Sequence, residues 1–157
     1  MKPTNSSLER SSPSLNDLLD EYALSHQNKA NKKIHYFCVP IIFWSITAML
    51  WMVAIPMVAN LAIVMTVLVS IYYISKDLKI ALQMIAFSLL CLLLNGLMQK
   101  QGLPLLSIAV IAFIVAWILQ FIGHHIEGKK PSFFKDLQFL LVGPAWIVRE
   151  LFTPSKN

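Results

Sequence analysis

The chain is 157 residues long, which suits a single domain. Hydrophobic residues make up 57% of it and charged residues only 13%, whereas a soluble domain usually carries about a quarter charged residues. The net charge of +5 does not indicate a nucleic-acid-binding protein, because the basic residues flank apolar runs and form no stripe with interleaved aromatic residues. The composition therefore predicts an integral membrane protein.

The N-terminal region precedes the first long apolar run. Residues 1–13 carry proline, serine and threonine, and we expect a disordered tail there. Ser14 is a suitable N-cap for a short helix, and His26 extends the apolar stripe of that helix by one turn. The stripe itself is formed by Leu15, Leu18, Leu19 and Tyr22. We expect this amphipathic helix to lie on the membrane surface or against neighbouring helices, two placements between which the sequence does not decide.

Four apolar runs follow, each close to the length of about 20 residues with which a helix crosses a hydrocarbon core. A helix satisfies every backbone polar group within the segment, so the runs predict transmembrane helices. The expected spans are residues 36–55, 57–74, 80–98 and 103–122. Pro56 leaves almost no loop between the first two, which predicts a tight hairpin. The expected fold is all-α: a polytopic integral membrane protein with residues 14–157 in one membrane domain.

Lysine and arginine are distributed unevenly around these runs. Of the thirteen, only Lys100 lies between the third and fourth spans, and the others precede the first span, separate the second from the third, or follow the fourth. Loops rich in lysine and arginine face the cytoplasm, so both termini are expected there. A bacterial inner membrane, or the endoplasmic reticulum in a eukaryote, would fit this topology.

A further apolar run covers residues 137–152 and is interrupted at Gly143-Pro144. It is too short and too broken to predict a span. We expect interfacial or re-entrant helices that pack against the bundle on its cytoplasmic side.

All four histidines lie at the borders of the apolar runs. His26 and His35 precede the first span, and His124 and His125 follow the fourth, so the topology places both pairs on one membrane face. Imidazole is a common ligand for iron, zinc and copper. A single histidine at such a border is more often an interfacial side chain with a solvated tip, but four in two clusters predict a shared metal site.

The C-terminal histidine pair is expected on a helix. His124 and Glu127 are three residues apart, and Gln120 is four before His124, so these three side chains share one helix face. His125 lies about 100° away. His125 can point in the same direction as His124 only if the helix ends between them. The flanking Gly123 and Gly128 make such an end plausible. Glu127 has three possible roles: a metal ligand, a partner that orients the ligands, or an ion-pair partner of the nearby lysines.

The N-terminal pair needs a bend in the chain. His26 and His35 are nine residues apart, which places them on opposite faces of a continuous helix. They converge only if the segment between them bends. Asn31, four residues before His35, would face the same way as His35. Asn28 and Asn31 are alternatively helix caps.

Two long patterns carry a resemblance to a known family. Residues 22–40 read Y-x-x-x-H-Q-N-K-x-N-K-x-I-H-x-x-x-x-P, and residues 120–131 read Q-F-I-G-H-x-I-E-G-x-x-P. Both are similar to the 2-hydroxy fatty acid dioxygenase family, whose fungal member acts in the conversion of phytosphingosine to odd-chain fatty acids. The resemblance extends from about residue 15 to residue 152.

This resemblance implies an Fe(II)-dependent α-oxidation, in which a 2-hydroxy fatty acid and O₂ yield a fatty acid one carbon shorter. It implies His26, His35 and His124 as iron ligands, and His125 as a fourth ligand or an acid–base group. It implies roles in supporting the ligands or in touching substrate for Asn28, Asn31, Gln120 and Glu127. Beside the resemblance, we expect His125 and Glu127 to be the catalytic residues, and Lys129 or Lys130 to offset the charge of the substrate carboxylate.

Two other functions remain open from the residues alone. One is a non-catalytic membrane scaffold or small-molecule carrier, in which the histidines serve packing or a pH response. The other is a zinc-dependent membrane hydrolase that uses the same histidines. Di-iron membrane hydroxylases and desaturases are excluded, because they need more histidines than the four present. The expected partners are the fatty acid, O₂ and the lipid bilayer, and the sequence leaves the oligomeric state open.

Overall fold

The computed structural model describes residues 14–24, 26–57, 59–128 and 141–152 of the chain. These residues form helices, together with one two-stranded hairpin. The helices are α1 (Leu15–Leu24), α2 (Lys29–Trp51), α3 (Leu61–Ile74), α4 (Leu78–Lys100), α5 (Leu105–Glu127) and α7 (Val142–Phe152), and the strands are β1 (Ala54–Ile55) and β2 (Ala59–Asn60). The predicted all-α class is confirmed. The expected disordered tail lies outside the described residues.

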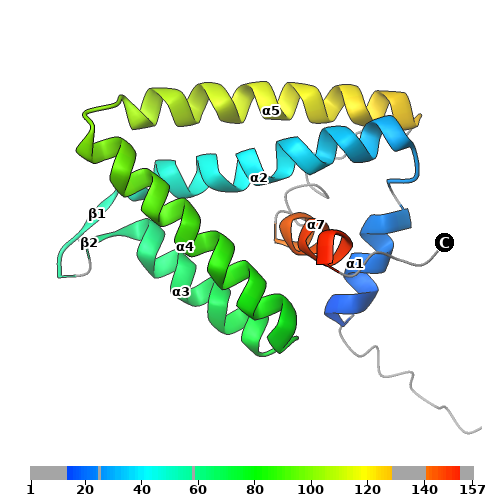
Figure 1. The fold of residues 1–157 in the computed structure, drawn as a ribbon, viewed down its shortest axis with the longest axis horizontal. Coiled ribbons are helices and arrows are strands. Elements are labelled where there is room, and N and C mark those ends of the chain that lie inside the picture. Colours follow the sequence, from blue (N-terminus) through cyan, green and yellow to red (C-terminus); the bar gives the residue numbers. More distant parts are fainter. Residues whose placement is uncertain (1–13, 25, 58, 129–140, 153–157) are drawn as a thin grey trace, which may run out of the picture.

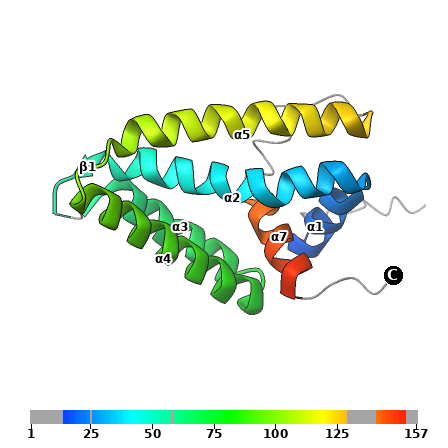
Figure 2. The same cartoon turned by 45° about the horizontal axis from the view of Figure 1, so that its top comes forward.

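Helices α2 and α5 run antiparallel and side by side, so the end of α5 lies beside the start of α2 (Figures 1 and 2). Helices α3 and α4 form a hairpin that meets α2 near the β-hairpin and diverges from it toward the other end. Helices α1 and α7 pack on each other beside the first half of α2. This arrangement gathers both histidine segments at one end of the molecule.

Within the described part of the chain, three helices are long and apolar enough to cross a membrane: α2, α4 and α5, each of 23 residues. At the helical rise of 1.5 Å per residue, each is about 34 Å long, which exceeds the roughly 30 Å of a hydrocarbon core. Helix α3 has 14 residues and is about 21 Å long. The predicted number of four spans is therefore not confirmed by length, although large apolar side chains on the helices are exposed, such as Leu82 (60%) and Ile111 (63%).

The connection between α2 and α3 differs from the predicted tight hairpin and explains why α3 is short. Helix α2 ends at Trp51, and Ala54 pairs with Asn60 in the antiparallel strands β1 and β2. Pro56 has no backbone N–H to donate to a helix, and it disfavours helical backbone at the residue before it. Met57 then adopts a left-handed conformation with φ of 68°. The residues expected to extend both helices form a β-hairpin instead.

Helix α2 also begins seven residues before the expected start of the first span, at Lys29 instead of residue 36. Its N-cap is Asn28, whose side-chain oxygen accepts hydrogen bonds from the backbone nitrogens of Ala30 (2.8 Å) and Asn31 (3.4 Å). Caps of this kind satisfy backbone donors that the first helical turn leaves open. His35 therefore lies inside α2.

Helix α1 forms as the pattern predicts. Ser14 and Asp17 exchange hydrogen bonds at its start, and the bonds from the Ser14 hydroxyl and backbone lower the pKa of the Asp17 carboxyl. The expected apolar stripe is buried at Leu15, Leu19 and Tyr22 and half-buried at Leu18. This stripe packs against α7, so α1 lies on a neighbouring helix.

Helix α7 begins where the sequence predicted an interruption. Gly143 and Pro144 lie in its first turn, where proline loses no intrahelical hydrogen bond. Trp146 is fully buried among α1 and α2 residues. Arg149 also forms an ion pair with Asp20 of α1 at 2.9 Å. The C-terminal segment thus closes the end of the molecule that carries the histidines.

Candidate metal centre

Three histidines converge on one point inside the molecule. His26 follows α1, His35 lies in the second turn of α2, and His124 lies in the last turn of α5. Their potential ligand atoms all lie within 4.8 Å of one another. The ring centroids are 4.2 Å apart for His26 and His35, 5.0 Å for His35 and His124, and 5.4 Å for His26 and His124. All three side chains are buried, with exposures of 1%, 1% and 6%.

His26 and His35 reach the same point because the chain bends between them. Helix α1 ends at Leu24, and Asn28 has extended backbone (φ −68°, ψ 128°) before α2 starts. This is the bend that the nine-residue spacing requires. The backbone nitrogen of His26 still donates to the carbonyl of Ala23 at 3.1 Å, so His26 stays attached to the end of α1.

Backbone carbonyls fix the orientation of two of the rings. Nδ1 of His26 lies 2.8 Å from the carbonyl oxygen of Tyr22, and Nδ1 of His35 lies 3.0 Å from that of Asn31. A carbonyl oxygen only accepts, so each Nδ1 must carry the hydrogen in these bonds. The lone pair of each imidazole is then on Nε2. This is the usual arrangement for a metal-binding histidine, whose other nitrogen is held by a carbonyl or carboxylate.

Aromatic side chains form a wall beside the histidines. The ring of Tyr22 stacks on His26 at a centroid distance of 4.2 Å. Trp146 of α7 lies 5.3 Å from Tyr22 and 5.9 Å from His26, and it stacks on Tyr36 at 5.7 Å. Such a wall shields the centre from water on this side.

Glu127 joins the end of α5 to the start of α2. Its carboxylate accepts hydrogen bonds from the backbone nitrogens of Gln27 (2.9 Å) and Asn28 (2.9 Å), and from Nδ2 of Asn31 (3.0 Å). An anion at a helix N-terminus is also favoured by the helix dipole. Among the roles left open by the sequence, these contacts favour one that orients the ligands, since His124 lies one turn before Glu127.

Helices α2 and α5 approach most closely at Gly123. A Cβ atom added there would clash with Oδ1 of Asn31, whose side chain is fully buried. Helix α5 continues through Gly123 and ends at Gly128, whose left-handed backbone (φ 72°) terminates it. The helix end that the sequence allowed at either glycine therefore falls after Glu127, and His124 and His125 both lie on the helix.

The remaining expected site residues are placed differently. His125 is exposed and is not part of the three-histidine group. Gln120 is 5% exposed, one turn before His124 on α5. Lys129 and Lys130 lie outside the described residues. Tyr22, Trp146 and Gly123 border the centre although the sequence assigned them no part in it, and the glycine within a helical run was the one local signal.

The donor set fits a transition metal. Three neutral imidazoles from separate segments can bind Fe, Zn or Cu and leave other coordination positions for substrate. The group found in the described part of the chain contains histidine nitrogens alone. Its geometry therefore indicates a metal without identifying which one.

Fold and site together define a helical protein with helices of membrane-crossing length and a buried three-histidine centre at one end. The family model described as "2-hydroxy-palmitic acid dioxygenase Mpo1-like" matches residues 12–154, and the chain belongs to this Mpo1-like family. The chain is also 34% identical over 146 residues to the 2-hydroxy-palmitic acid dioxygenase MPO1 of Saccharomyces cerevisiae, covering 87% of this chain and 78% of that protein. No solved structure matches the chain. The resemblance seen in the sequence is confirmed.

Proposed function

We propose that this protein is an Fe(II)-dependent dioxygenase that converts 2-hydroxy fatty acids to fatty acids one carbon shorter. The overall reaction balances as R–CH(OH)–COOH + O₂ → R–COOH + CO₂ + H₂O. The observation that carries the proposal is the convergence of His26, His35 and His124 on one buried point. The name of the yeast relative supplies the substrate class and the oxygenase chemistry.

In this proposal the three histidines hold the metal through their ring nitrogens. Bound iron supplies redox chemistry with O₂ and a Lewis-acid site for the carboxylate and hydroxyl of the substrate. Glu127 and Asn31 keep α5 against α2, so that His124 stays in register with His35. Tyr22 and Trp146 exclude water on the side facing α7.

The other expected site residues keep proposed roles around the substrate. Gln120, one turn before His124, is buried and would donate hydrogen bonds to a bound carboxylate or hydroxyl. Asn28 holds the start of α2 and so supports the ligands indirectly. Lys129 or Lys130 would offset the charge of the substrate carboxylate. His125, exposed on the last turn of α5, would act as an acid–base group or a fourth ligand.

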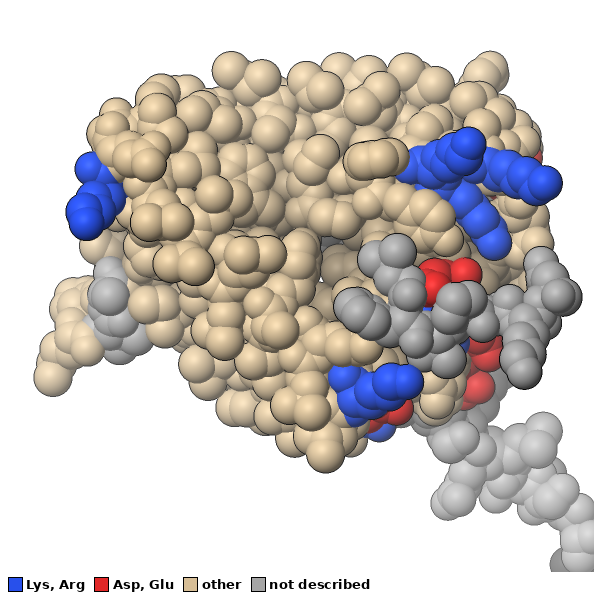
Figure 3. Space-filling view, in the orientation of Figure 1, with Lys and Arg blue, Asp and Glu red and all other residues tan. Residues whose placement is uncertain are grey.

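The proposed membrane placement has four spans, with the centre at the cytoplasmic border and both termini in the cytoplasm. Figure 3 shows lysine and arginine side chains at the left, upper right and lower edges of one face, with a broad uncharged surface between them. The starts of α2 and α4, which carry Lys29 and Lys79, lie toward the end of the molecule with the centre, and Lys100 closes α4 at the other end. This distribution fits the positive-inside rule.

Metal analysis and O₂ uptake of the purified full-length protein test the proposal. We expect stoichiometric iron, and O₂ consumption with 2-hydroxypalmitate but not with palmitate. The His35→Ala variant should lose both. Stoichiometric zinc, with turnover that consumes no O₂, would instead support the hydrolase. Folded protein that binds no metal would support the scaffold or carrier.

A further inference from the structure

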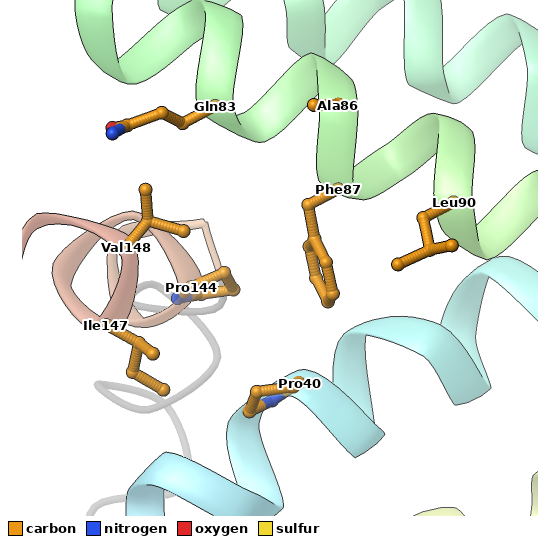
Figure 4. A pocket seen from close by; sticks show the side chains of 8 residues that line it. All are labelled: Pro40, Gln83, Ala86, Phe87, Leu90, Pro144, Ile147 and Val148. Carbon is orange, nitrogen blue, oxygen red and sulfur yellow. The ribbon is translucent and has the colours of Figure 1, made fainter. Parts of the chain in front are cut away.

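An apolar cavity of about 390 Å³ lies where α2, α4 and α7 meet (Figure 4). Helix α4 diverges from α2, and α7 packs against both (Figure 2). Pro40 of α2, Ala86, Phe87 and Leu90 of α4, and Pro144 and Ile147 of α7 line the cavity. Among the described residues in its lining, only Gln83 is polar. We name this cavity and its continuation along α4 the α4 groove.

The groove continues from this cavity toward the β-hairpin. A second hollow of about 260 Å³ shares Pro40, Phe87 and Leu90 with the first and extends to Leu94. From Gln83 to Leu94 the lining spans about 16 Å along α4, at 1.5 Å per residue. One leaflet of a bilayer, half of the roughly 30 Å hydrocarbon core, is about as deep. The groove therefore has the length of one long acyl chain.

The groove begins next to the metal centre. Ile147, in its lining, directly follows Trp146, whose ring lies 5.9 Å from His26. Pro40, which also lines the cavity, is five residues after His35 on α2, or about 7.5 Å along the helix axis. Helix α2, which carries His35, and helix α7, which carries Trp146, thus form the end of the groove next to the metal centre.

We propose that the α4 groove binds the hydrocarbon tail of the 2-hydroxy fatty acid, with the carboxylate and hydroxyl at the three histidines. This inference rests on the proposed function and adds the site that selects for a long chain. An apolar lining with a single amide matches a hydrocarbon tail, because burying apolar surface drives such binding without any fixed polar partner. The tail lies parallel to α4 and points into the membrane, so the substrate needs no large change of orientation when it leaves the bilayer.

A separate apolar hollow, outside the α4 groove, provides a matched control. It has a volume of about 440 Å³ and lies between α2 and α5, where residues including Ile41, Ile111 and Ala112 line it. Its volume and chemistry resemble those of the first cavity, but α7 does not contribute to it. Any apolar hollow on a membrane protein would attract lipid, so only the α4 groove should respond specifically to substrate.

The first experiment compares Ala86→Trp with Ala112→Trp in the full-length protein. Tryptophan at position 86 should displace several methylene groups, so kcat/KM for 2-hydroxypalmitate should fall about tenfold or more. The loss for 2-hydroxyoctanoate should be clearly smaller, because its shorter tail makes fewer contacts in the groove, and the iron content should stay unchanged. Ala112→Trp should match the unmodified protein with both substrates. Equal losses in both variants, or equal losses for both chain lengths in Ala86→Trp, would overturn the assignment.

The second experiment does not depend on turnover. A 2-hydroxy fatty acid with a diazirine at its far end is photolysed with the protein in lipid nanodiscs without O₂, and labelled peptides are mapped by mass spectrometry. We expect label on α4 between Ala86 and Leu94, removed by excess 2-hydroxypalmitate. Label on α2–α5, or α4 label that only excess phospholipid removes, would show an ordinary lipid site and refute the inference. If excess 2-hydroxypalmitate removes the label from α4 but the protein takes up no O₂, the proposed oxidation would be wrong and the binding site would stand.

Discussion

Nδ2 of Asn31 donates a hydrogen bond of 3.0 Å to Oε2 of Glu127, a residue 96 positions later in the chain. This contact joins the helix that carries His35 to the helix that carries His124. The same carboxylate accepts backbone hydrogen bonds from Gln27 and Asn28, so it also holds the bend that brings His26 inward. One carboxylate thus fixes the relative positions of the three segments that supply the histidines.

Glu127→Gln is expected to weaken metal binding about tenfold or more, the usual cost of losing a group that supports the ligands. The amide keeps the size of the side chain but turns an NH₂ group toward backbone donors that need an acceptor. Iron retention during dialysis against a graded series of chelator concentrations measures the effect. Glu150→Gln, the same change on α7, is the control and should retain iron normally. Equal retention by both variants would show that the Glu127 contacts do not support the centre.

Gly123→Ala should destabilise the protein by about 1–3 kcal/mol, as overpacking of a close contact usually does. The new methyl group would clash with Oδ1 of Asn31, and the Asn31 side chain cannot move away without loosening its hydrogen bond to Glu127. The Tm measured in detergent and the iron content should both decrease.

Gly96→Ala is the matched control for this change. It also replaces a glycine inside a helix, but its Cβ would lie an ordinary 3.8 Å from the ring of Trp51. Alanine favours a helix over glycine by about 1 kcal/mol, so Gly96→Ala should keep or raise the Tm. Similar Tm changes in both variants would contradict a specific clash at Gly123.

The sequence predicted the regular parts of the fold well and the junctions poorly. Helices α4 and α5 match the expected spans to within a few residues, because a continuous apolar run is a local signal. The early start of α2 was missed, since Lys29 and Lys33 read as a polar flank. The β-hairpin was missed because Pro56 marks a break without giving the length of the connection.

Much of the candidate site was also foreseeable, because topology alone placed both histidine clusters at one end. His26 and His35 were predicted to converge only if the chain bends between them, and the extended backbone at Asn28 forms this bend. The contribution of Trp146 was not foreseeable, since it depends on packing between α1 and α7 at opposite ends of the chain. Long-range packing of this kind leaves no periodic signal in a single sequence.

His125→Ala and His35→Ala should separate the roles left open for His125. His35 is buried within the group, so its removal should abolish iron binding. His125 is exposed on the last turn of α5, so its variant should keep stoichiometric iron. If His125 is the acid–base group, that variant should also lose turnover, by about 10²–10⁴-fold. Loss of iron from His125→Ala would instead identify a fourth ligand, and full activity would exclude both roles.

Trp146→Ala is expected to destabilise the closed end of the molecule by about 3–5 kcal/mol, the usual cost of truncating a buried tryptophan. Its ring packs on Tyr22, His26 and Tyr36, so the loss should also admit water to the metal centre.

Trp146→Phe keeps an aromatic ring at this position but makes it smaller, so it tests the contribution of packing. Nε1 of Trp146 is buried without a hydrogen-bond partner among the described residues, so phenylalanine should lose only part of the packing. The expected order of Tm and of iron retention is the unmodified protein, then Trp146→Phe, then Trp146→Ala. An alanine variant with normal Tm and normal iron retention would show that α7 does not close the centre.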